Sequence, residues 1–256
     1  MNDVEVAVAA ALAGADVVRA RFGGPLTRVA KSPTDFATEA DLDAERAILE
    51  VIRRARPDDA FLGEEAGLVG SALADRTWLV DPLCGTLNFA AQTPLVAVNV
   101  ALRAARTVPA AAVAAPFADT ALWTDGHRAH RRRGDHDEIV APSPDSRLVD
   151  IDFNTDPAFA AALASAPAYT ARFGTRVVST SLALAWVADG RRAGYVQSGD
   201  VRDSVHFAAG IAVCLAAGCL VTGLAGQPVW SDGGGLLAAA DRETHEALLQ
   251  CIAEAT

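Results

Sequence analysis

Acidic residues follow two expected strands in the first third of the chain, where their carboxylates can converge. Glu64 and Glu65 follow the apolar pair at residues 61–62, and Asp81 ends the run WLVD at residues 78–81. Hard divalent cations prefer carboxylate and carbonyl oxygens as ligands. Carboxylates placed just beyond strand ends are therefore suited to a divalent-cation site.

A sharp turn is expected directly after Asp81, in the segment DPLCGT. Pro82 and Gly85 are the residues that favour it. In such a turn the backbone carbonyl of Leu83 can face the same ion as the Asp81 side chain. A helix that begins near Gly85 and Thr86 offers free N–H groups and the positive end of its dipole to a phosphate.

Asp41 is a third candidate, at the expected start of a helix. It lies three residues after Thr38, which is the spacing of a helix capping box. Helix caps and turns select the same residue types, so each acid also has a purely structural interpretation. Asp41 can be only a helix cap, Glu64 a solvated loop acid, and Asp81 a turn residue. Taken singly, each position favours the structural interpretation.

Apolar and polar segments alternate along the chain, which indicates a layered α/β or α+β architecture. The polar stretch at 124–138 predicts an exposed hairpin or loop. Residues 142–145 predict a hinge between an N-terminal half at 1–141, which carries the metal and phosphate motifs, and a C-terminal half at 142–256, within one compact unit. Helices are expected near 3–22, from Thr38 to Pro57, and near 156–165, 179–189 and 204–217, and strands near 61–62, 78–81, 95–102, 108–115, 121–123, 148–153, 169–173, 194–196 and 220–222.

The composition is that of a folded, acidic protein. Of 256 residues, 51% are hydrophobic and 21% charged, which excludes intrinsic disorder. Lys and Arg number 22 and Asp and Glu 32, so the formal net charge is −10. This acidity argues against binding to nucleic acid or to an anionic membrane. It leaves phosphate ligands open, because a cation can lie between an acidic site and a phosphate.

The four cysteines form no CxxC pair, which indicates a reduced, cytoplasmic protein. Acids precede the first apolar run, so the N-terminus predicts an amphipathic helix rather than a secretory signal. The uncharged stretch at 207–225 is rich in Ala and Gly. It favours a buried helix followed by a strand over a membrane span.

The chain resembles the inositol-monophosphatase family of sugar-phosphatase-fold enzymes in four segments, which occur in the same order along the sequence. The longest is GEE followed by WLVDPLCGTLNF, against the family pattern GEE and W-[IV]-[IV]-D-P-[IL]-D-G-T-x-N-F. Upstream, KSPTDFATEAD is similar to K-S-x-x-D-x-V-T-x-x-D. Downstream, HFAAGIAVCLAAGCLVTGLAGQP is similar to W-D-x-A-A-G-x-x-I-x-x-E-A-G-G-x-x-x-D-x-x-G-x-P, and LLAAADRETHEALLQ to the closing strand and helix. The likeness runs from about residue 3 to residue 253.

This resemblance implies a layered αβαβα sandwich and a Mg²⁺-dependent phosphomonoesterase that acts on a small phosphorylated metabolite as a homodimer. The physical chemistry agrees, because a divalent cation lowers the pKa of a bound water and screens the charge of a phosphate. The resemblance assigns one metal to Glu64, Asp81 and the Leu83 carbonyl, the orientation of the attacking water to Asp41 and Thr86, and the phosphate to the N–H groups near Gly85 and Thr86.

Two positions depart from the family pattern, and both belong to the second metal. Cys84 replaces the second Asp of D-P-x-D-G-T, and His206 replaces the Asp of W-D-x-A-A-G; the nearest acid, Asp203, lies three residues earlier. One interpretation is a softer site of Cys84, His206 and Asp81 that prefers Zn²⁺ or Mn²⁺. The other is a weak or absent second metal, so that activity depends on one ion or is lost. We favour the second interpretation, because Mg²⁺ depends most on hard oxygen ligands.

The expected substrate pocket is also altered. The family's G-T-A at a helix start, which contacts substrate hydroxyls, matches Ser179, Thr180 and Ser181. The Glu that binds inositol hydroxyls aligns near Gln197. Specificity for inositol phosphate therefore does not carry over, and a sugar, a cyclitol or a nucleoside monophosphate all remain open.

The leading function from the sequence is divalent-metal-dependent hydrolysis of a small phosphate monoester. The alternative is a catalytically degraded or repurposed member of the family. Such a protein would bind a phosphorylated ligand, or would perform other chemistry with Cys84 and His206.

Overall fold

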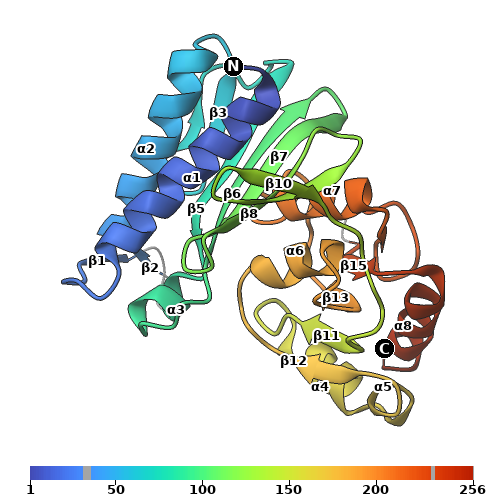
Figure 1. Ribbon diagram of the computed structural model, residues 1–256. Helices are drawn as coiled ribbons and strands as arrows, with labels where there is room; N and C mark the ends of the chain where they lie inside the picture. The colour runs from blue at the N-terminus through green and yellow to red at the C-terminus, as the bar shows by residue number, and fades with distance from the viewer. Residues whose placement is uncertain (31–35, 232–233, 256) are drawn as a thin grey trace.

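Five layers of secondary structure build the protein, in the order helix, sheet, helix, sheet, helix (Figure 1). The computed structural model describes residues 1–30, 36–231 and 234–255. An eight-stranded sheet comes from the first half of the chain and a five-stranded sheet from the second, with two helices between them. This arrangement is the layered αβαβα sandwich expected from the sequence.

The eight-stranded sheet has the strand order β10-β9-β8-β7-β6-β5-β3-β4. Neighbouring strands are antiparallel except β3 and β5, which run parallel. The carboxyl ends of β3 and β5 therefore meet at one edge, and the acids that follow these strands are brought together. The strands are β3 (Ala60–Gly63), β4 (Gly67–Val69), β5 (Arg76–Cys84), β6 (Ala97–Ala104), β7 (Thr107–Ala115), β8 (Thr120–Thr124), β9 (Ala129–Arg133) and β10 (His136–Ile139).

The five-stranded sheet has the order β12-β11-β13-β15-β14. β11 is parallel to both of its neighbours, and the remaining pairs are antiparallel. The boundary expected at residue 141 falls between β10 and β11, where the chain leaves the larger sheet for the smaller one. The strands are β11 (Leu148–Ile151), β12 (Gly174–Arg176), β13 (Gly194–Gln197), β14 (Leu220–Thr222) and β15 (Leu236–Ala239), and β1 (Arg28–Ala30) pairs separately with β2 (Phe36–Thr38).

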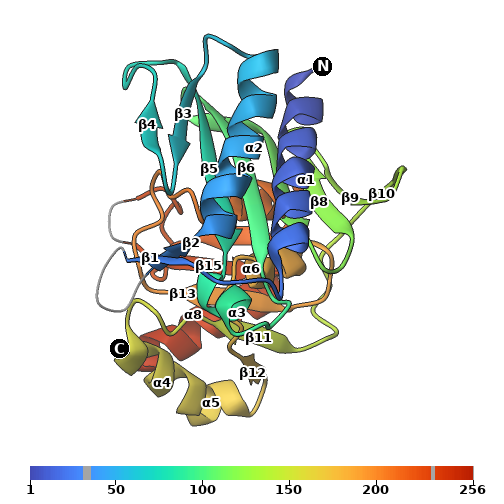
Figure 2. The same ribbon diagram turned by 90° about the vertical axis from the view of Figure 1, so that its left-hand side faces the viewer.

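Helices cover every broad face of the two sheets (Figures 1 and 2). α1 and α2 lie on the outer face of the eight-stranded sheet, α6 and α7 lie between the sheets, and α4, α5 and α8 lie on the outer face of the five-stranded sheet. Three apolar cores fill the spaces between these layers. The helices are α1 (Asp3–Arg21), α2 (Glu39–Ala55), α3 (Thr86–Ala90), α4 (Pro157–Ser165), α5 (Pro167–Thr170), α6 (Leu182–Ala188), α7 (Ala208–Ala217) and α8 (Arg242–Ala255).

A capping box at its first turn and close packing against α1 fix the position of α2. A capping box closes its first turn, with the backbone N–H of Thr38 donating to Asp41 at 2.7 Å. Its buried face carries Ile48, which packs against α1 and the sheet. Gly14 of α1 lies so close that a Cβ atom there would be 2.7 Å from Ile48 Cδ1. The small residue on α1 thus lets α2 approach closely and fixes the position of Asp41.

Three of the expected elements are wrong in type or extent. The strand expected near 169–173 is replaced by the end of α5, because Pro167 suits the first position of a helical turn. The helix expected from residue 179 begins at Leu182, since Ser179 has a left-handed backbone with φ 47°. The helix expected from residue 204 begins at Ala208, after a turn. The other expected helices and strands are present, and 124–138 contains the hairpin β9–β10.

Within the described ranges, no helix combines the length and the apolar character needed to cross a membrane. The uncharged stretch at 207–225 divides into α7 and β14. Gly218 ends α7 in a left-handed backbone with φ 95°, which turns the chain into the strand. The expected buried helix followed by a strand is confirmed.

Replacing Ile48 with alanine should lower the free energy of unfolding by about 2–5 kcal/mol, because its side chain is completely buried. Leu42 is the matched control, since it lies on the same helix with 37% of its surface exposed. Leu42→Ala should change the free energy by less than about 1 kcal/mol. Urea unfolding followed by circular dichroism measures both. Equal losses in the two variants would contradict the assigned buried face of α2.

Candidate active site

Asp81 is a fully buried carboxylate near the end of β5, where the strand leaves its ladder with β6. The register of the pairing shifts between Asp81 and Cys84, so the residues between them bulge out of the ladder. Within this bulge the Leu83 N–H donates a hydrogen bond to Asp81 Oδ1 at 3.1 Å. The bulge therefore gathers the Asp81 carboxylate and the backbone of Leu83 into one turn.

Gly85 allows this turn to continue into α3. Its φ of 105° lies in the left-handed region, and a Cβ atom there would be 3.0 Å from the Leu95 carbonyl oxygen. α3 begins at Thr86, and no side chain of the described residues caps its N-terminal end. Asn88 donates hydrogen bonds to the carbonyls of Leu95 and Val178, both at 2.9 Å. These bonds fix the turn against the second half of the chain.

Asp41 uses its two carboxylate oxygens for different contacts. Oδ2 accepts hydrogen bonds from the backbone and the hydroxyl of Thr38, at 2.7 and 2.5 Å. Oδ1 accepts a hydrogen bond from the Thr86 hydroxyl at 3.1 Å. Burial raises the pKa of Asp41, although the hydrogen bonds from Thr38 and Thr86 oppose the shift. The Asp41 side chain therefore caps α2 and at the same time contacts Thr86, in the turn after β5.

Glu64 lies directly after β3, beside the end of β5. Its backbone N–H donates to the Val80 carbonyl at 3.0 Å, and its carboxylate is half-buried. The loop that follows is held by the buried Glu45, which accepts hydrogen bonds from the backbone N–H groups of Glu65 and Ala66 at 2.9 and 2.7 Å. Glu45 was missed by the sequence reasoning. The sequence feature that could have indicated Glu45 is its position four residues after Asp41, which places both acids on the same face of α2.

Asn99 was also missed, and it links Asp81 to the second half of the chain. Its side-chain amide donates to Ser181 Oγ at 2.8 Å and lies 3.5 Å from Asp81 Oδ2. The Thr180 hydroxyl donates to the Cys84 carbonyl at 3.1 Å, and the Ser181 N–H to the Cys84 sulfur at 3.2 Å. Residues 180 and 181 thus lie against the turn after β5. The signal for Asn99 is a single amide in the apolar run LVAVNVAL.

Asp81, Cys84 and His206 offer ligand atoms that all lie within 4.8 Å of one another. His206 Nδ1 is 2.7 Å from Asp81 Oδ2 and 3.9 Å from Glu64 Oε2. The imidazole is 43% exposed, whereas the Asp81 carboxylate has no exposed surface. His206 therefore lies directly against Asp81, at the place that the resemblance gives to a second-metal carboxylate.

The protonation of this cluster follows from its contacts. Burial disfavours the charged ring, but the hydrogen bond to Asp81 and the contact with Cys84 raise the pKa of His206 to about 11. Burial and the charge of Asp81 raise the pKa of the Cys84 thiol. At neutral pH the pair is an imidazolium and a thiol. Because metals bind neutral imidazole and thiolate, an ion on this cluster must displace both protons.

Asp203 and Gln197 lie outside this cluster. Asp203 forms an ion pair with Arg103, so it does not supply the missing carboxylate. Gln197 ends β13 and is buried, and its side-chain amide exchanges hydrogen bonds with the backbone of Gly199. The polar atoms of Gln197 therefore bind its own turn. Ser179 is exposed beside the turn, and its carbonyl oxygen would be 3.4 Å from a Cβ atom on Gly85.

The upstream segment of the resemblance is described only in part. Residues 31–35 of KSPTDFATEAD lie outside the described residues. Phe36–Thr38 forms β2, and Asp41 lies in the first turn of α2. The part of this segment that reaches the site is therefore the Thr38–Asp41 cap.

The sequence model of the inositol monophosphatase family matches residues 2–256, and the chain belongs to this family. The chain is 41% identical over 96 residues to an inositol-1-monophosphatase from Caulobacter vibrioides, a match that covers 37% of this chain and 38% of that protein. It is 31% identical over 231 residues to Nus factor SuhB from Pasteurella multocida, covering 85% and 83% of the two chains. The solved structure of inositol monophosphatase from Anabaena (Nostoc) sp. superposes with a TM-score of 0.80 at 27% identity, covering 98% of this chain and 95% of that chain.

Oxygen atoms predominate at the edge where β3 and β5 end. Gly63 pairs with Val80, so the carboxylates of Glu64 and Asp81 follow directly neighbouring residues. Carboxylate and carbonyl oxygens are the ligands that a hard divalent cation prefers. The Thr86 hydroxyl lies 3.3 Å from the Leu83 carbonyl oxygen and donates to Asp41 Oδ1 at 3.1 Å, so a buried proton acceptor lies beside the turn that follows Asp81.

In the metal-free protein, His206 should keep its proton far above pH 6.5, the value of an unperturbed histidine. Because the pKa is raised, the stability from the His206–Asp81 pair is fully present below pH 6.5 and is lost as the pH rises through about 11. NMR titration of the imidazole in the presence of a chelator measures this. Asp81→Asn is the control, and it should move the pKa of His206 down. A histidine that titrates near pH 6.5 in the unaltered protein would contradict the contact.

Proposed function

We propose that this protein hydrolyses a small phosphate monoester with the help of a divalent cation. The observation that carries the proposal is the pairing of β3 with β5, which sets Glu64 and Asp81 directly after the paired residues Gly63 and Val80, together with the contacts of Thr86 with Asp41 and the Leu83 carbonyl. Membership of the inositol monophosphatase family supports the same class of reaction. Catalysis of this kind needs a cation site, a water-orienting group and a phosphate contact in one place.

Glu64, Asp81 and the Leu83 carbonyl would hold the cation, for which Mg²⁺ is our first candidate. A bound divalent cation supplies charge screening for the phosphate and makes a water molecule more acidic. The set of two carboxylates and one carbonyl leaves room in the coordination shell for water and phosphate oxygens, as Mg²⁺ usually requires. Glu45 and Asn99 would keep these ligands in position through their bonds to the loop after Glu64 and to Asp81.

Thr86 and Asp41 would orient the attacking water. The Thr86 hydroxyl has one hydrogen, which it donates to Asp41 when the Leu83 carbonyl faces a cation. The lone pairs of Thr86 Oγ1 are then available to accept a proton from water. As the water oxygen bonds to phosphorus, its proton passes to this pair. The bond from phosphorus to the ester oxygen breaks, and that oxygen takes up a proton from solvent.

The phosphate and the alcohol of the substrate would lie on different segments. The N–H groups at Gly85 and Thr86 are our candidates for the phosphate, since no described side chain caps that end of α3. Ser179, Thr180 and Ser181 are candidates for the substrate hydroxyls. Sugar, cyclitol and nucleoside monophosphates are all proposed substrates. Gln197 is a further candidate contact only if its hydrogen bonds to its own turn break.

A homodimer, a cytoplasmic location and the two halves divided at residue 141 remain predictions from the sequence.

We further propose that the second metal of the family pattern is weak or absent here. Two ligands of one tetrahedral zinc ion lie roughly 3.3 Å apart, given metal–ligand distances of about 2.0–2.2 Å. His206 Nδ1 and Asp81 Oδ2 are in direct contact at 2.7 Å. A second ion would have to separate them. A Cys84–His206 site for Zn²⁺ or Mn²⁺ is the alternative.

Purified protein should release phosphate from at least one monoester in a panel of sugar, cyclitol and nucleoside monophosphates with Mg²⁺, Mn²⁺ or Zn²⁺. Asp81→Asn should slow this release by about 100-fold or more, because the variant removes a proposed metal ligand. Asp135→Asn is the matched control in the exposed turn between β9 and β10, and it should leave the rate unchanged. Colorimetric detection of phosphate measures the rates.

No release above the Asp81→Asn level with any metal would contradict the phosphatase proposal. The same esters would then be tested by calorimetry. Binding without release supports the ligand-binding alternative, which the contact of His206 with Asp81 favours.

The double variant Cys84→Asp, His206→Asp restores both carboxylates of the family pattern. If the missing second metal limits the reaction, this variant should gain Mg²⁺-dependent activity by about 10-fold or more. The two single variants are the controls, and each should gain less than the pair. A loss of activity in the double variant would mean that Cys84 and His206 have roles of their own.

A further inference from the structure

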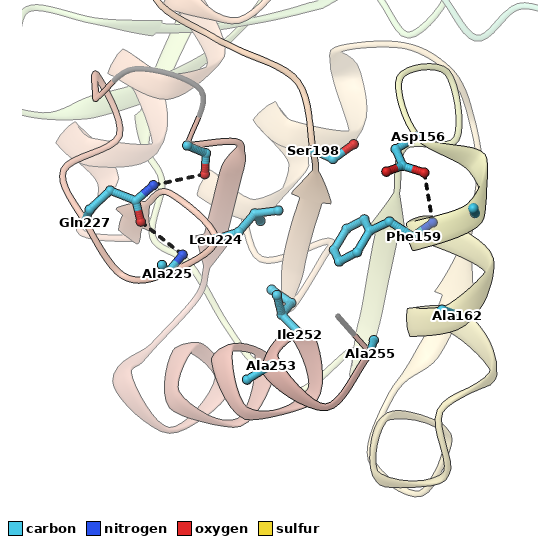
Figure 3. A pocket seen from close by; sticks show the side chains of 12 residues that line it. Asp156, Phe159, Ala162, Ser198, Leu224, Ala225, Gln227, Ile252, Ala253 and Ala255 are labelled. Atoms are coloured by element: carbon cyan, nitrogen blue, oxygen red, sulfur yellow. Dashed lines mark hydrogen bonds between the residues drawn. The ribbon is translucent and has the colours of Figure 1, made fainter.

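Two of the cavities that the described residues line are each built from several segments of the chain and lie apart from the candidate active site. The larger, of about 710 Å³, opens between α4 and α8 (Figure 3). Phe159, Leu224 and Ile252 point into it, and its one charged lining residue among those described is Asp156, which caps α4. The smaller, of about 290 Å³, is charged and is hereafter called the arginine pocket. Its lining includes Arg103, Arg106, Arg202, Asp203, Trp230 and Leu79.

The arginine pocket is basic, although the chain as a whole carries a net charge of −10. Arg103 forms an ion pair with Asp203, and Arg202 contacts Asp200 at 3.0 Å. Arg106 is exposed and forms no ion pair with any acid in the described ranges. Arg103 and Arg202 are thus each paired with an acid, and Arg106 leaves one excess positive charge at the pocket, which suits an anion.

Apolar surface completes the pocket. Leu79 and Ala208 are almost fully buried, and Val108 is half-buried. Trp230 also lines the pocket, with 37% of its surface exposed. An exposed tryptophan beside arginines offers a flat face to a ring and charge-assisted hydrogen bonds to an attached anionic group. The volume is near the lower end for small-molecule sites, which limits the ligand to a compact molecule.

The arginine pocket is close to the candidate active site and shares no lining residue with it in the described part of the chain. Leu79 precedes Asp81 by two positions, so both side chains point to the same face of β5. Asp203 and Ala208 stand on either side of His206 in the sequence, in the segment that leads into α7. The pocket therefore adjoins the segment that carries His206.

We propose that the arginine pocket binds a small organic anion in which a phosphate group is joined to an aromatic ring. Arg106 would bind the phosphate in a forked geometry, and Trp230 would stack on the ring. The negative charge of the phosphate complements the one excess positive charge at Arg106. This site goes beyond the phosphatase proposal and does not depend on it, because none of its residues belongs to the proposed metal or water-orienting groups.

Fluorescence titration with adenosine 5′-monophosphate tests the proposal on the full chain, with a chelator present to prevent hydrolysis. We expect saturable quenching that disappears in Trp230→Phe. Arg106→Glu should weaken the affinity by about 10-fold or more, the loss expected for one charge-assisted contact. Arg128→Glu, an exposed arginine outside the pocket, is the matched control and should bind as the unaltered protein does. Circular dichroism checks that each variant is folded.

Titrations with adenosine and with inorganic phosphate test the ring and the phosphate group separately. Each compound should bind more weakly than the nucleotide. Asp81→Asn should bind the nucleotide as the unaltered protein does, which distinguishes this pocket from the candidate active site. Equal affinity in Arg106→Glu and the unaltered protein would overturn the proposal. So would inorganic phosphate that binds as tightly as the nucleotide, or the absence of saturable quenching at millimolar nucleotide.

Discussion

A buried negative charge at the seam between the two sheets is the constraint on which the rest of the structure depends. The Asp81 carboxylate has no exposed surface, and an uncompensated charge in such a place is strongly unfavourable. Three groups surround it: the Leu83 N–H, the Asn99 amide and the His206 ring. They come from the bulge at the end of β5, from β6 and from the turn that precedes α7. The interactions that satisfy Asp81 therefore also join the first sheet to the helices that separate the sheets.

The candidate metal ligands other than Asp81 are of two kinds, and the difference shapes the proposed chemistry. Glu64 and the Leu83 carbonyl are oxygen donors, suited to a hard cation. Cys84 and His206 offer a sulfur and a nitrogen that both carry protons at neutral pH. A positively charged ring thus lies against Asp81 where the family pattern has another carboxylate. One bound cation, together with the positive charge of the His206 ring, is consistent with the negative charge of Glu64 and Asp81.

The sequence predicts the parts of the structure that depend on local patterns. The capping box of Thr38 and Asp41, the turn after Asp81 and the layered αβαβα architecture all follow from spacing, residue type and resemblance. Interactions between distant segments could not be predicted in this way. The contact of His206 with Asp81 spans 125 positions, and that of Asn99 with Ser181 spans 82. The strand expected near 169–173 failed because apolar spacing alone does not distinguish a strand from a short helix that begins at Pro167.

The number of cations at Asp81 is the most direct measurement of whether His206 takes the place of the second metal. Crystals soaked in Mn²⁺ and measured by anomalous scattering show each bound ion and its ligands. We predict one strong peak, within bonding distance of Glu64, Asp81 and the Leu83 carbonyl, with His206 still in contact with Asp81. Two strong peaks, or a peak bound by His206 and Cys84, would contradict this interpretation.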